Sequence, residues 1–119
     1  MDANAVLDKN YEGAEHSFLY DLYERGVFCV ETFWEYYDSI DALARERLEQ
    51  GMKCAVVVKI AATYQRVMQA FLEHMDQEDP TSIIGFPKNY PAYLERLEGA
   101  VDAYYRGSCW NKEWFSLQR

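Results

Sequence analysis

The side chains best suited to chemistry in this sequence are carboxylates that recur at helical spacing. Glu31 and Glu35 are four residues apart, so on a helix they lie one turn apart on the same face. Two carboxylates can serve as a general acid and a general base. The face that carries them is predicted to be solvated, however, and solvated carboxylates are not tuned for proton transfer. We therefore expect no catalytic residues and no enzyme.

Histidines and cysteines are the other candidates for chemistry, and their spacing predicts no metal site and no cofactor. His16 and His74 belong to no Glu-x-x-His motif, which a di-metal helical bundle requires. Cys29, Cys54 and Cys109 form no CxxC pair and offer no zinc-ligand spacing. A role of Cys109 as a nucleophile stays an open alternative, although no activating base is identifiable in the sequence. Cys29 and Cys54 are expected to behave as small buried apolar residues in a reducing compartment.

The net charge of −8 lies entirely in the first third of the chain. Residues 1–41 contain ten acidic and two basic residues, whereas residues 42–119 contain ten of each. This balance argues against direct binding to nucleic acid or to an anionic membrane, because both need Lys and Arg. It predicts a protein partner with a basic surface, for example a nucleic-acid-binding protein. The alternative is that the excess charge only keeps the protein soluble.

The stretch Ser17–Leu48 is predicted to form one long helix on which the others pack. Gly26 either ends a first helix or lies inside a continuous one, and the unbroken phase of the pattern favours continuity. The apolar arc is wide enough that a second chain could share it, as in a homodimer. One narrow face carries the residues predicted to bind a partner: Asp21, Glu24, Phe28, Glu31, Glu35 and Asp38. Phe28 is either an isolated exposed ring or an interface anchor among the carboxylates.

The remaining sequence predicts an all-α fold, a small helical bundle in a single domain of residues 1–119. Residues 1–13 are expected to be a flexible tail or a short cap. Ser39 marks a bend at most, and Gly51 ends the first long helix. A second long helix over Met52–Gln77 returns antiparallel to the first, with an apolar row that includes Met75.

Two further elements follow the predicted hairpin. The connection at 77–89 is too apolar for a free loop, so Ile83, Ile84 and Phe86 are expected to fold back over the hairpin. A third helix begins near Asn89 and ends at Gly107. The segment 109–119 is a short aromatic helix whose tryptophans pack on the bundle or contact another chain.

Localisation is predicted to be cytoplasmic. Residues 1–15 are polar and acidic, so no signal peptide is visible, and no apolar run approaches the ~20 residues that span a bilayer.

These features favour a non-enzymatic acidic protein that binds and inhibits or modulates a protein partner. Carboxylates one helical turn apart are separated by ~6 Å, close to two phosphate steps, so mimicry of nucleic acid is one version of this hypothesis. Small phage anti-CRISPR proteins and toxin immunity proteins are often of this size and acidity, although no motif links them to this chain. The alternative is a helical adaptor or homodimeric interaction module that uses apolar and aromatic surfaces.

Overall fold

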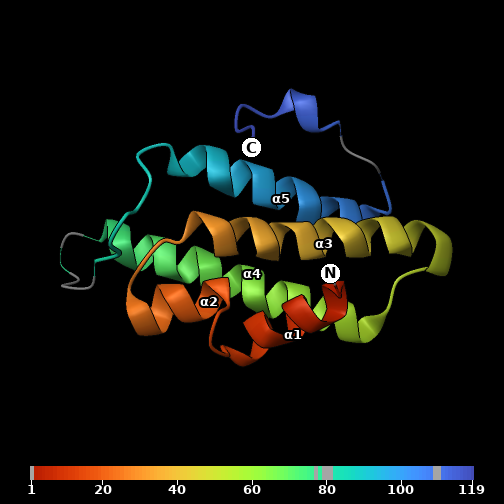
Figure 1. Ribbon diagram of the computed structural model, residues 1–119. Helices are drawn as coiled ribbons and strands as arrows, with labels where there is room; N and C mark the ends of the chain where they lie inside the picture. Colours follow the sequence, from red (N-terminus) through yellow and green to blue (C-terminus); the bar gives the residue numbers. More distant parts are fainter. Residues whose placement is uncertain (1, 77, 79–81, 109–110) are drawn as a thin grey trace.

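Helices make up almost all of the regular structure in this protein, as the sequence predicts. The computed structural model describes residues 2–76, 78, 82–108 and 111–119 (Figure 1). Its elements are α1 (Ala3–Glu12), α2 (Phe18–Tyr20), the π-helical turn η1 (Asp21–Arg25), α3 (Val30–Gln50), α4 (Cys54–Met75), α5 (Tyr90–Arg106) and the 3₁₀ turn η2 (Lys112–Trp114). None of the described helices is long and apolar enough to cross a membrane.

Helix α3 is the centre of the fold. It contacts α5 on one side and α1 and α2 on the other, and α4 returns antiparallel to it (Figure 1). The predicted turn at Gly51 is confirmed, because this glycine has a positive φ of 81° and its N–H donates to the Arg47 carbonyl at 2.8 Å. Ser39 lies inside the continuous α3, so no new helix begins at this residue.

The predicted long helix from Ser17 to Leu48 is wrong in its first half. Gly26 adopts the left-handed conformation with φ 63°, and the chain then runs extended before α3 begins at Val30. The extended segment forms hydrogen bonds with the chain that follows α4. Phe28 N–H donates to the Ile84 carbonyl at 2.9 Å, and Ile84 N–H donates to the Gly26 carbonyl at 2.7 Å. Gly26 therefore ends a helix, since glycine adopts this conformation at little steric cost.

The N-terminal residues form a helix rather than a flexible tail. Asp2 caps α1 by accepting a hydrogen bond from Ala5 N–H at 3.2 Å, and Gly13 ends it in the left-handed conformation. Buried Asn10 joins α1 to α2, because its Oδ1 accepts from Leu19 N–H at 3.2 Å. The short cap is thus the correct interpretation of this segment.

The later helices match their predictions closely. Helix α4 begins two residues after the expected start and α5 begins one residue after Asn89, with Gly107 ending α5 as expected. Ile83 is buried and Phe86 packs on Phe71, with ring centroids 5.0 Å apart, but Ile84 is exposed. The expected fold-back over the hairpin is therefore confirmed for Ile83 and Phe86 and wrong for Ile84.

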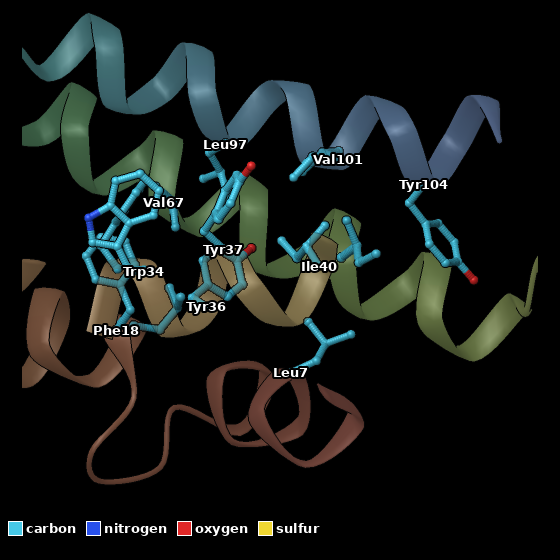
Figure 2. Close-up of a cluster of buried hydrophobic side chains, with 14 of the residues drawn as sticks. Leu7, Phe18, Trp34, Tyr36, Tyr37, Ile40, Val67, Leu97, Val101 and Tyr104 are labelled. Carbon is cyan, nitrogen blue, oxygen red and sulfur yellow. The ribbon is translucent and has the colours of Figure 1, made fainter. Parts of the chain in front are cut away.

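Aromatic and aliphatic side chains from all five helices fill one core (Figure 2). Phe18, Tyr36 and Ile40 lie at its centre and are fully buried. The Tyr36 hydroxyl donates to Thr63 Oγ1 at 2.6 Å, and this bond joins α3 to α4 inside the core. Leu97, Val101 and Tyr104 close the core from α5, as the period of that helix predicts.

Burial of Tyr36 gives the fold an alkaline limit. Desolvation raises the pKa of Tyr36 above the ordinary value of 10.0, so the folded state holds this proton at pH values where the unfolded chain loses it. The contribution of Tyr36 to the free energy of unfolding is fully present below pH 10.0. It falls as pH rises above that value, by up to ~1.4 kcal/mol per pH unit. The pKa values of Tyr23, Tyr64 and Tyr105 are raised in the same direction.

The variant Tyr36→Phe tests this assignment. We expect it to lose ~1 kcal/mol at neutral pH with the buried hydrogen bond, and to lose less further stability than wild type between pH 9 and pH 11. Urea unfolding at these pH values measures both effects. Equal pH dependence in the two proteins would show that Tyr36 does not set the limit.

Candidate functional site

The acidic face predicted from the sequence does not exist as one continuous surface, because Gly26 divides it between two elements. Asp21 lies in η1 and is only 2% exposed. Its carboxylate pairs with Arg25 at 3.0 Å and accepts the Thr32 hydroxyl at 2.7 Å. Asp21 therefore joins η1 to α3 across the extended segment and is not exposed at the surface.

Phe28 is a core residue, and its predicted exposure is wrong. The ring is 5% exposed and lies 5.1 Å from Tyr93 and 5.4 Å from Phe18, measured between ring centroids. The helical wheel misplaced it because residues 27–29 are extended. The ring therefore points inward at a position where a continuous helix would have pointed it outward.

Two further carboxylates of the predicted face are engaged in ion pairs. Glu35 pairs with Lys9 of α1 at 2.8 Å. Asp38 binds the guanidinium of Arg119 through both of its oxygens, at 2.9 and 2.5 Å. Only Glu24 and Glu31 of the six are exposed and form no ion pair with the described residues. The regular spacing on which nucleic-acid mimicry depended is absent from this arrangement.

The fold also brings basic residues from later in the chain to the acidic first third. Lys59 of α4 pairs with Asp8 at 2.6 Å, and Lys112 pairs with Asp41 at 2.8 Å. Together with Asp38 and Arg119, these pairs neutralise part of the charge excess inside the molecule. The remaining exposed carboxylates near the α1–η1 junction are Glu12, Glu15 and Glu24.

A hollow of about 410 Å³ lies at this junction. Its lining comes from the end of α1, from α2 and η1, and from α4: Glu12, Gly13, Leu19, Tyr20, Tyr23, Glu24 and Arg66. We call this site the acidic hollow. Its two carboxylates, Glu12 and Glu24, and its tyrosine rings are of the chemical types that bind cationic side chains in proteins.

Arg66 adds a positive charge to the lining of the acidic hollow but forms no ion pair with Glu12 or Glu24. Its Nη1 donates to the Tyr11 carbonyl at 2.6 Å, and its guanidinium lies 5.5 Å from the centre of the Tyr11 ring. Tyr23 donates its hydroxyl to the Arg66 carbonyl at 2.7 Å, which holds one wall in place. Partial burial and the nearby Glu73 raise the pKa of Tyr23, against a smaller opposing effect of the Arg66 charge.

Of the residues that line the acidic hollow, only Glu24 belongs to the binding face predicted from the sequence. Glu12 falls in the segment 1–13, for which the sequence predicts a tail or a short cap, and Tyr20 and Tyr23 are not on the predicted binding face. The available signal was the pair of helix boundaries around α1, with Asp2 as a capping residue and Gly13 as a terminating glycine. These two boundaries place Glu12 at the end of a helix.

Arg96 is a second residue that the sequence did not single out. It is 4% exposed on the inner face of α5, and no carboxylate among the described residues pairs with it. Its Nε donates to the Tyr37 hydroxyl at 3.0 Å, and its Nη1 donates to the Leu117 carbonyl at 2.8 Å. Arg96 therefore holds the C-terminal segment against α3 and α5.

The C-terminal segment packs on the bundle through Phe115 and Leu117 rather than through Trp114. A Cβ on Gly99 of α5 would lie only 2.5 Å from the Phe115 ring, so glycine makes room for this ring. Trp114 is 74% exposed, so the first of the two predicted alternatives, packing on the bundle, is wrong for this residue, and contact with another chain stays a prediction. Trp110 lies outside the described residues.

His74 has a structural role, and two of the cysteines are free thiols. Nδ1 of His74 accepts from Ile83 N–H at 2.9 Å, and its ring packs on Phe86. Cys29 and Cys54 are free thiols, and Cys54 is exposed, which corrects its expected burial; Cys109 lies outside the described residues. Within the described ranges, no three His, Cys, Asp or Glu side chains come together as a metal site.

In comparisons with protein-family models, curated proteins and solved structures, none matches this chain significantly.

Proposed function

We propose that this protein is a non-enzymatic binding module that inhibits or modulates a partner protein with a basic surface. The observation that supports the proposal is the acidic hollow, where Glu12 and Glu24 are exposed beside two tyrosines. A lysine or arginine of the partner would enter this hollow and meet both carboxylates. The ring of Tyr23, nearly half exposed, would cover the apolar part of that side chain.

The proposal differs from mimicry of a nucleic-acid backbone. Mimicry needs a row of free charges at regular spacing, whereas here Asp21, Glu35 and Asp38 are held by cations of this chain. Capture of one or two cationic side chains in a hollow needs only the carboxylates that remain free. The partner class is therefore a protein with a protruding Lys or Arg.

A capture experiment tests this function. The wild-type chain, Glu12→Gln/Glu24→Gln and the control Glu95→Gln/Glu98→Gln serve as baits in a cell lysate. The control removes the same charge from exposed positions of α5. Capture is compared at about 0.1 M and about 1 M salt, between which the Debye length falls from ~10 to ~3 Å.

The expected result is a partner that wild type and control capture at low salt. The Glu12→Gln/Glu24→Gln variant and high salt should each abolish capture, because both remove charge-assisted contacts. A partner retained by the double variant through high salt would contradict the proposal.

A further inference from the structure

The outer face of α4 is a second surface without an assigned role, independent of the acidic hollow. Seven residues at alternating spacings of four and three form it: Cys54, Val58, Ala61, Gln65, Met68, Leu72 and Met75. We call these residues the outer seam. Leu72 is 63% exposed and Val58 is 50% exposed, and only Met68 is partly covered. Met75 was predicted to be buried, but it too is exposed.

The outer seam carries no charge over its whole length, in a chain whose residues are 27% charged. Helix α4 rises ~1.5 Å per residue, so the uncharged strip is ~32 Å long. The charged residues of α4 lie beside the outer seam rather than on it. Lys59 pairs with Asp8 and Arg66 binds the Tyr11 carbonyl, both toward α1.

Helix α4 thus has two apolar faces. Val56, Ile60, Thr63 and Val67 pack inward against the core, where each is buried. The outer seam lies on the other side and repeats every seven residues, which is the spacing of a coiled-coil seam that packs on a second helix. No described element of the chain covers it, and large exposed apolar patches on soluble proteins mark interaction sites.

We propose that the outer seam binds a second copy of this chain, with the two α4 helices antiparallel about a two-fold axis. Charge polarity along the helix supports this partner and orientation. Exposed Lys53, which has one long ion pair with Glu46 at 3.4 Å, lies at its beginning, and Glu73 and Asp76 lie at its end. Antiparallel pairing brings the basic end of each copy to the acidic end of the other, whereas parallel pairing would join like charges.

The side chains of the outer seam also complement one another in this orientation. In antiparallel coiled coils each a position faces a d position of the partner helix. With the axis between Arg66 and Val67, small Ala61 faces Leu72 of the other copy and Val58 faces Met75. Pairing small residues with large ones fills the layers, as close packing requires.

The size of the seam and the net charge set the strength of this dimer. A contact about one helix wide and ~32 Å long belongs to the small class of interfaces, below ~1,200 Å². Each copy has a net charge of −8, and Glu98 and Asp102 lie near Tyr64 beside the seam. Two copies therefore repel at long range, so added salt should strengthen the dimer.

Sedimentation equilibrium over about 10 µM to 1 mM protein tests the proposal directly, since weak interfaces dissociate in this range. The expected mass of the wild-type chain rises with concentration from 14.0 kDa toward twice that value, and rises further in high salt. Leu72→Glu should raise the dissociation constant about tenfold or more, because it places a charge in the seam. Leu48→Glu is the matched control at an exposed position of α3 and should dimerise like wild type.

A mixing experiment tests the orientation. Ala61→Lys and Leu72→Glu should each be monomeric alone at concentrations where wild type is dimeric. When mixed, they should form a heterodimer, because antiparallel pairing places the lysine of one chain opposite the glutamate of the other. Parallel pairing places neither charge opposite the other and restores nothing.

Three results would overturn the proposal. The first is a wild-type mass of 14.0 kDa at every concentration and salt level, which would leave the seam to a different protein or to solvent. The second is a dimer that Leu72→Glu does not weaken more than Leu48→Glu. The third is a mixture that remains monomeric although the wild-type protein dimerises.

Discussion

Replacing Phe28 with alanine is expected to lower the free energy of unfolding by about 3–5 kcal/mol, the range for deleting a buried aromatic ring. The ring is almost completely buried among rings of α2, α3, α4, α5 and the connection before α5. Its deletion would leave a cavity lined by these rings, which cannot move together without disturbing all of these elements. The neighbours are Phe18, Phe33, Phe71, Phe86 and Tyr93.

Urea unfolding followed by circular dichroism measures this loss. Trp114→Ala is the matched control, because it removes a larger ring from an exposed position and should change stability by no more than about 0.5 kcal/mol. If Phe28→Ala cost as little as the control, Phe28 would be a surface residue and the original interface prediction would regain support.

Replacing Arg96 with alanine should cost about 2–4 kcal/mol, since hydrogen bonds to charged groups contribute ~1.5–3 kcal/mol each. The substitution removes the hydrogen bond to Tyr37 and frees the carbonyls of Lys112 and Leu117. It also removes the stacking of the guanidinium on Trp34, at 5.6 Å from the ring centre. The C-terminal segment should then detach from α5 before the helices unfold.

Amide hydrogen exchange at residues 111–119 reports that detachment, and urea unfolding reports the total loss. Arg106→Ala is the control on the same helix, because Arg106 is exposed and its pair with Asp102 is worth ~1 kcal/mol at most. Equal stability of the two variants, with exchange unchanged at the C-terminus, would show that Arg96 does not hold this segment.

The parts of the fold that the sequence predicted well have local signals at their ends. Gly51 and Gly107 terminate helices, and Pro91 lies in the first turn of α5. Such boundaries depend on residues within one turn of each other, so a single sequence contains the information. The prediction of a continuous helix through Gly26 was wrong because the apolar pattern keeps its phase across this residue. The break depends on backbone pairing with Ile84, far along the chain.

The candidate site depended even more on distant contacts. Asp38 looked free in the sequence, yet Arg119, 81 residues later, binds both of its oxygens. Lys59 and Arg66 lie more than 50 residues after their partners, since Lys59 pairs with Asp8 and Arg66 binds the Tyr11 carbonyl, both in α1. Which carboxylates remain free for a partner is thus a property of the tertiary structure.

The most direct test of the account is the affinity of the captured partner, measured by calorimetric titration with matched variants. If the acidic hollow makes the contact, Glu12→Gln/Glu24→Gln should raise the dissociation constant about 100-fold, at roughly tenfold for each charge-assisted contact. Asp38→Asn should change it less than about twofold, because that carboxylate is already bound by Arg119. An affinity that depends on Asp38 but not on Glu12 and Glu24 would contradict the account and return the binding site to α3.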